Sequence, residues 1–233
     1  MSNHTVEGFE DLDSRDLAIP RLQIIQGISA DILERHKNYN IGNIYNNFTE
    51  DQYDGETGIL CSLLYHNKLY LEVVPIKEGG GIVAIHSDLN INDFQFSKER
   101  SSFIKDGNDL LESHYHLIHM WEPEEMDAMI IMARTQIKKS NIWMTLARML
   151  SRDGDPCSIY EGVYRITVEN ESRKGFKYKG WNIRRHTDRL LDTEKLDKVR
   201  TLYGNAKMQR QKFLQIRKLS EVHIDKDEVG YLE

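Results

Sequence analysis

Cations and aromatic rings are interleaved between positions 173 and 185, where the chain reads RKGFKYKGWNIRR. Lysine and arginine gain affinity for a nucleic acid by releasing counterions from its phosphates. Aromatic rings stack on bases of any identity, at about 1–3 kcal/mol per base. This composition predicts a sequence-tolerant surface for a single strand. Its members are Arg173, Lys174, Phe176, Lys177, Tyr178, Lys179, Trp181, Arg184 and Arg185.

These side chains divide between two faces if the segment is a β-strand. Successive residues of a strand point to opposite sides, so Phe176 shares a face with Tyr178. Lys177, Lys179 and Trp181 fall on the other face, and either face could meet a nucleic-acid strand. The alternative interpretation is that the rings of the first face belong to the core and the cations form a solvated surface.

A second basic site precedes a predicted helix. We expect residues 141–151 to form this helix, with Ser140 as its N-cap and Trp143 on its apolar face. Lys138 and Lys139 come just before its N-terminus, where backbone N–H groups add to the attraction for an anion. This spacing predicts a phosphate site at the two lysines.

The charge of the chain is sorted along its length. Residues 1–133 hold 9 Lys or Arg against 23 Asp or Glu, residues 134–218 hold 21 against 9, and residues 219–233 hold 1 against 5. The three blocks therefore carry about −14, +12 and −4, which the overall charge of −6 conceals. Both candidate phosphate sites lie in the basic block, so the distribution favours a polyanionic ligand.

Nuclease chemistry has a weaker basis in the sequence. Gln136 and Lys138, with Asp127 upstream, resemble half of a metal-dependent nuclease site. Such a site needs a carboxylate-rich pocket for Mg²⁺, and only Glu124 and Glu125 are near in sequence. A nuclease therefore remains a minor alternative, and we expect the protein not to be an enzyme.

Three histidines, His114, His116 and His119, have the composition of a metal cluster. On a strand His114 and His116 share a face, but His119 lies on the other, and no Cys or Asp at ligand spacing completes the set. The run of glycines at 79–81 lacks the Lys-Ser/Thr that follows in a P-loop. We therefore expect structural histidines, a turn at the glycines, and neither a metal nor a cofactor.

The elements that must position these residues are mostly short strands. Apolar, β-forming runs predict strands at 20–26, 59–65, 69–74, 82–85, 115–120, 128–133 and 160–169, and the polar run 170–175 predicts a hairpin tip leading into a strand at 176–179. Helical patterns cover 141–151 and 188–219. The expected fold is α+β, mainly β, an OB-like small barrel with an internal helix and a helical C-terminal extension. The periodicity also permits another α+β sheet.

Four regions follow from this pattern. We expect an acidic flexible leader at residues 1–18 and an OB-like nucleic-acid-binding core at 19–187. We expect a helical extension at 188–219 and an acidic tail at 220–233. The tail could occlude the basic groove or bind a replication or recombination protein. The extension is expected to pack on its own barrel, and an oligomer formed through it is the alternative.

Composition indicates the class of protein and its compartment. No apolar run approaches the ~18 residues of a membrane span, and the N-terminus lacks the pattern of a secretory signal. We therefore expect a soluble cytoplasmic protein. Cys61 and Cys157 have no metal-ligand spacing and are expected to be free thiols.

Several short motifs along the chain form a pattern shared with known proteins: Asp16-Leu17-Ala18-Ile19-Pro20-Arg21-Leu22, Ile25-Gln26, Ser29, Gly42-Asn43-Ile44, Phe48-Thr49, Tyr70-Leu71-Glu72-Val73, Gly79-Gly80-Gly81-Ile82-Val83, His86, Thr135-Gln136-Ile137-Lys138-Lys139-Ser140 and Trp143. In these segments the chain resembles a group of tailed-phage single-stranded DNA-binding proteins. The resemblance implies an OB-like core that coats exposed single strands during phage replication and recombination in the cytoplasm of the infected cell.

The leading hypothesis is a non-catalytic, sequence-tolerant single-stranded DNA-binding protein, with RNA as another ligand that the residues permit. Phosphates would be held by Lys138, Lys139 and the cations of 173–185, and bases would stack on the rings of Phe176, Tyr178 and Trp181. A phage interaction protein that inhibits or redirects a host nucleic-acid enzyme, by acidic mimicry of DNA, is the alternative.

Overall fold

The computed structural model describes residues 20–27, 29–87, 89–152, 154–173, 175–186 and 191–216. The predicted leader at 1–18 and the predicted tail at 220–233 lie outside these residues, as does Lys174. None of the helices in the described ranges combines the length and the hydropathy that a membrane crossing requires. Cys61 is buried, Cys157 is partly buried, and both are free thiols, as expected.

β-strands are the predominant secondary structure of the described chain, which confirms the predicted α+β, mainly β class. The strands are β1 (Arg21–Ile24), β2 (Ile44–Asn46), β3 (Gln52–Tyr53), β4 (Ile59–Val73), β5 (Ile82–His86), β6 (Gln95–Ser97), β7 (Ser102–Lys105), β8 (Asn108–Glu122), β9 (Met126–Ala133), β10 (Ser151–Arg152), β11 (Asp155–Pro156), β12 (Tyr164–Arg173) and β13 (Phe176–Arg185). The helices are α1 (Ala30–Arg35), α2 (Ile137–Arg148) and α3 (Thr193–Ile216), with 3-10 turns η1 (Ile76–Glu78), η2 (Ile91–Asp93), η3 (Arg134–Gln136) and η4 (Ile159–Glu161).

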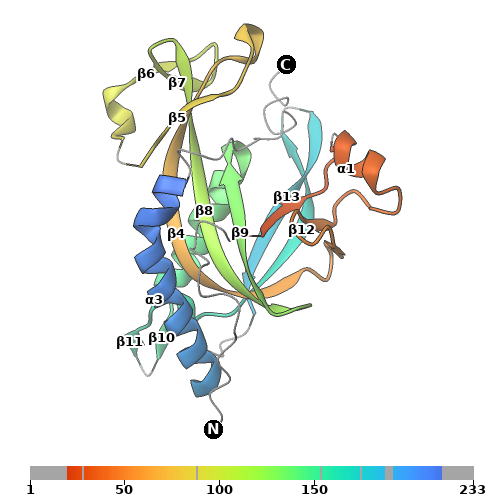
Figure 1. Cartoon of the computed structure of the whole chain (residues 1–233), viewed down its shortest axis with the longest axis vertical. Coiled ribbons are helices and arrows are strands. Elements are labelled where there is room, and N and C mark those ends of the chain that lie inside the picture. Colours follow the sequence, from red (N-terminus) through yellow and green to blue (C-terminus); the bar gives the residue numbers. More distant parts are fainter. Residues whose placement is uncertain are drawn as a thin grey trace, which may run out of the picture.

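One curled sheet joins all of these strands except β10 and β11, which pair with each other. Its order is β13-β12-β4-β8-β9-β1-β2-β3, while β5 pairs with β4 and the β6–β7 hairpin pairs with β8. The sheet bends into a half-barrel, and β5, β6 and β7 extend one end of it (Figure 1). The described residues match the expected small barrel only in this curvature.

Two 15-residue strands, β4 and β8, are the longest strands of the sheet. They pair antiparallel, and their register shifts between Leu60 and Cys61 and again between Leu63 and Tyr65. Such bulges increase local twist and bend a sheet. The sequence predicted separate strands at 59–65 and 69–74, but β4 has no break between them: His66 and Asn67 pair with β8, opposite His116 and Tyr115.

Helix α2 closes the concave face of the half-barrel. Its Trp143 is fully buried, stacks on the ring of His116 with centroids 4.8 Å apart, and meets Tyr164 edge-on. The helix begins at residue 137, four residues before the predicted start, so the prediction that Ser140 is its N-cap is wrong. The Ser140 hydroxyl lies inside the helix, where it bonds to histidines of β8 and cannot cap.

Helix α3 covers the opposite face of β4 and β8 (Figure 1). Leu196 and Val199 pack on Leu64, the ammonium of Lys195 lies 5.3 Å from the centroid of the Trp121 ring, and Lys198 pairs with a carboxylate of the β8–β9 turn. The described part of the extension therefore packs on its own sheet, as the sequence predicted.

Glutamine side chains connect the edge strand β13 to the segments that follow β1 and β9. The Gln26 amide, just after β1, accepts a hydrogen bond from the N–H of Lys179 at 3.0 Å and donates one to its carbonyl at 2.7 Å. The Gln136 carbonyl oxygen accepts from the N–H of Trp181 at 3.0 Å. An edge strand has unpaired backbone groups, so these amides take the place of a neighbouring strand.

Candidate nucleic-acid interface

The predicted basic strand is β13, and it forms a hairpin with β12. Ten residue pairs connect the two strands, from Tyr164 opposite Arg185 to Arg173 opposite Phe176. Strand β12 pairs with β4 only through residues 164–166, so the rest of the hairpin extends past the sheet. We call residues 167–181 of β12 and β13 the hairpin arm. The strands continue to Arg173 and Phe176, so the predicted tip at 170–175 is shorter than expected.

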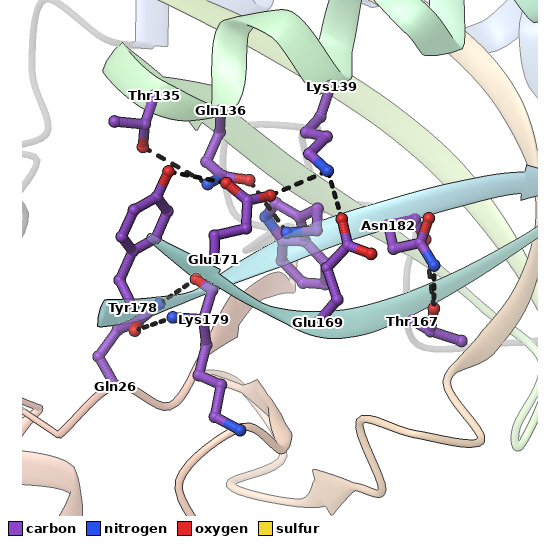
Figure 2. Close-up of polar contacts among 11 residues, drawn as sticks. Gln26, Thr135, Gln136, Lys139, Thr167, Glu169, Glu171, Tyr178, Lys179 and Asn182 are labelled. Carbon is purple, nitrogen blue, oxygen red and sulfur yellow. Dashed lines mark hydrogen bonds and ion pairs between the residues drawn. The ribbon is translucent and has the colours of Figure 1, made fainter. Parts of the chain in front are cut away.

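One face of the arm carries the two predicted stacking rings. Phe176 is 60 % exposed, and Tyr178, two residues further on the same face, is half-buried. The Tyr178 hydroxyl donates a hydrogen bond of 2.7 Å to the carboxylate of Glu171, its cross-strand neighbour (Figure 2). The ring of Phe176 is therefore open to a ligand, and the ring of Tyr178 is held beside it.

Trp181 lies elsewhere. It is 3 % exposed and packs in the core with Trp143 and Ile183. Its ring lies at the base of the arm and packs in the core, so a base cannot stack on it in this structure.

Three cations on or near the arm have no acidic partner among the residues that the structure describes. Lys177 is exposed and Lys179 is half-buried on the face opposite Phe176, and Lys138 is exposed on the first turn of α2. The side chain of Lys179 extends away from the hairpin (Figure 2). The end of this side chain lies close to Gly42. An unpaired ammonium keeps its charge available for a phosphate.

Lys139, the other half of the predicted phosphate site, is already occupied. Its ammonium pairs with Glu169 and, at 2.9 Å, with Oε1 of Glu171 (Figure 2). Burial acts to lower the pKa of Lys139, but the hydrogen bonds to these two carboxylates outweigh it and leave the pKa raised. Gly180 stands opposite Glu169 and has no side chain, and the carboxylate of Glu171 lies in the space that a Cβ there would need.

The remaining predicted cations do not gather at one place. Arg184 and Arg185 lie at the far end of β13, about 26 Å along the strand from the tip. Arg184 is exposed and faces Arg165, which pairs with Glu122 at 3.1 Å. The backbone of Arg173 lies opposite Phe176 at the tip. The structure therefore separates the predicted residues into a group at the arm and a pair at the base of the hairpin.

A polar cluster that the sequence analysis missed lies under α2. His66 of β4 and His114 and His116 of β8 surround Ser140, whose hydroxyl oxygen is 2.6 Å from Nδ1 of His114 and 3.0 Å from Nε2 of His116. Nε2 of His66 is 3.5 Å from Nδ1 of His114. Nε2 of His114 lies 2.7 Å from a carboxylate oxygen of Glu112. Cross-strand pairing of His66 with His116 creates this cluster, and the sequence offered only the alternation of His114 and His116 as a signal.

Burial sets the protonation of this cluster. It lowers the pKa of His66 to about 4, with a further effect from the charges of His114 and Lys68. Burial likewise lowers the pKa of His116 well below its usual value. Both rings are therefore neutral at pH 7. No group of three or more His, Cys, Asp or Glu within the described ranges is placed to hold a metal ion.

The residues of the nuclease hypothesis are kept apart. Asp127 is the second residue of β9 and bonds at 2.7 Å to His119, which faces away from the other two histidines as predicted. Gln136 follows the other end of that strand and bonds to the backbone of β13. Glu124 contacts Tyr53, and Glu125 bonds to His119 at 3.1 Å. These groups therefore do not form one cation site in this structure.

Comparison with known proteins gives one match. A family model described as Pam3 phage gp34-like protein matches residues 1–216. No curated protein and no solved structure matches the chain. Because the model covers most of the 233 residues, the chain belongs to the Pam3 phage gp34-like protein family and is a phage protein.

Proposed function

We propose that this protein is a non-catalytic, sequence-tolerant single-stranded DNA-binding protein of phage replication or recombination, acting in the host cytoplasm. The observation that carries the proposal is the hairpin arm: an aromatic ring, Phe176, is 60 % exposed on one face of it, and Lys177 and Lys179 on the other face have no acidic partner among the described residues. An exposed aromatic ring costs solvation free energy, and a base stacked on it removes that cost.

Each part of the arm has a role in the proposed complex. Bases stack on Phe176 and on the adjoining ring of Tyr178. Lys177 and Lys179 hold phosphates from the other face of the same ribbon, and Lys138 extends this surface onto α2. Arg173 and Lys174 lie at the turn in sequence and complete the expected phosphate contacts.

The chemistry of these contacts explains the expected lack of sequence preference. Every base presents a π-face to a ring, and every nucleotide presents the same phosphate to a lysine. An RNA strand offers the same two groups, so we expect a competitor oligo-rU to displace oligo-dT in part. Arg184 and Arg185, at the base of the hairpin, contribute through their long-range charge.

A paired comparison tests the proposal. The binding of fluorescein-labelled oligo-dT, measured by fluorescence anisotropy, is compared between Phe176→Ala/Lys177→Ala and Phe96→Ala/Lys98→Ala. The control pair has the same composition: Phe96 is 50 % exposed and Lys98 is exposed, but both belong to the β6 end of the sheet. Figure 1 shows that end apart from the arm.

The expected loss for the arm variant is about 1–3 kcal/mol from stacking alone, which corresponds to a factor of about 5–150 in Kd. Loss of one phosphate contact also reduces the slope of log K against log [salt] by about 0.7. The control variant should bind like the wild type. Equal losses in the two variants, or no binding by the wild type at low salt, would refute the proposal.

A further inference from the structure

Two carboxylates on the hairpin arm bind a lysine and a tyrosine that could otherwise contact a nucleic acid. Glu169 and Glu171 lie on the face of β12 that carries Phe176 and Tyr178 on β13. Between them they hold the ammonium of Lys139, and Glu171 also accepts the hydroxyl hydrogen bond of Tyr178 at 2.7 Å. A phosphate offers the same chemistry as these carboxylates, namely anionic oxygens that accept from a lysine and a tyrosine.

The geometry of the arm keeps this contact local. The side chains of Lys139 and Glu171 are 20 % and 17 % exposed, while Glu169 is 39 % exposed at the rim. The two carboxylates outnumber the single lysine, so their neighbourhood keeps a net negative charge. A phosphate that approaches Phe176 therefore meets repulsion from the two carboxylates, and it gains Lys139 only when that lysine leaves them.

We propose that Glu169 and Glu171 are an internal competitor for single-stranded DNA, which withholds Lys139 and Tyr178 from the strand and so weakens binding at the arm. This inference rests on the proposed function and concerns the regulation of the same site. Its consequence is that a strand binds firmly only when several other contacts, at Phe176 and the unpaired lysines, are made together.

Replacement of both carboxylates by amides tests the inference as a gain of affinity. Glu169→Gln/Glu171→Gln keeps the size of the side chains and frees Lys139, so oligo-dT should bind at least about fivefold more tightly near 100 mM salt. One added phosphate contact should steepen the slope of log K against log [salt] by about 0.7.

A matched variant separates this effect from a general change in charge. Glu122→Gln/Glu125→Gln alters the net charge by the same amount and also frees two cations, Arg165 and Lys198, which lie outside the arm. This control should tighten binding by less than twofold. An equal gain in both variants, or no gain at Glu169 and Glu171, would overturn the inference.

A single substitution and the wild-type result complete the design. Glu169→Gln alone changes the more exposed carboxylate and should give part of the gain in affinity even if the double variant folds poorly. No gain in this single variant would contradict the proposal that the carboxylates compete with DNA. If wild-type binding depends on Phe176 and the glutamine variants do not bind more tightly, only this inference fails. If neither the wild type nor the glutamine variants bind oligo-dT, the proposed function fails as well.

Discussion

The histidine cluster under α2 makes the fold sensitive to acid. His66 and His116 are neutral in the folded protein because burial lowers the pKa of each, to about 4 for His66. In the unfolded chain both titrate near the ordinary value of about 6.5. Below that pH the unfolded chain binds protons that the folded chain does not accept. Stability therefore falls as the pH decreases from about 6.5 toward 4.

The size of the effect follows from this difference. Between pH 7.5 and 5 a shift from about 6.5 to about 4 corresponds to about 2 kcal/mol for His66, and to somewhat less once the solvent-exposed part of its ring is allowed for. His116 acts in the same direction, because burial holds its pKa well below the usual value. The free energy of unfolding should therefore decrease by about 2 kcal/mol or more over this range. Glu72 and Glu112, whose pKa values are about 2, lose their stabilising contribution mainly below pH 4.5.

Urea denaturation at pH 7.5, 6 and 5, followed by tryptophan fluorescence, measures this loss. His116→Gln should remove part of the pH dependence and His66→Gln/His116→Gln most of it, although both variants are less stable at pH 7.5. His186→Gln is the control, because His186 is exposed and outside the cluster. A double variant that loses as much stability between pH 7.5 and 5 as the wild type would refute the reasoning.

Two further predictions concern the packing around α2 and the glutamine bridge. Trp143→Ala removes a fully buried ring between His116 and Tyr164 and should lower the free energy of unfolding by about 3–5 kcal/mol, measured by urea denaturation; a loss below 1 kcal/mol would show that the core does not depend on this ring. Gln26→Ala breaks both bonds to Lys179 and should cost about 1–3 kcal/mol and speed amide hydrogen exchange in β13, whereas unchanged exchange would contradict the bridge.

The local features of the candidate site could be predicted from the sequence. The alternation of residues 176–181 correctly predicted a strand with Phe176 and Tyr178 on one face, because the period of a strand depends only on sequence spacing. The mainly β class followed from the short β-forming runs in the same way. The side of the strand that faces the core, and so the burial of Trp181, could not be read from that period.

Non-local contacts account for the rest. Lys139 reads as a free cation beside Lys138, but hairpin pairing brings Glu169 and Glu171 to it from 30 and 32 positions away in the chain. Ser140 reads as a helix cap, but it lies inside α2 and its hydroxyl bonds to two histidines of β8. His66 and Asn67 have turn composition, yet pairing with β8 keeps them in an uninterrupted strand, since tertiary context overrides local propensity.

The central claim is that a single strand of DNA binds at the hairpin arm, and photocrosslinking tests it most directly. The wild-type protein is irradiated with oligo-dT at low salt, and the crosslinked peptides are identified by mass spectrometry. We predict crosslinks at Phe176 and Tyr178, which decrease as salt rises. Absence of crosslinks at low salt, or crosslinks confined to residues outside 167–181, would contradict the account.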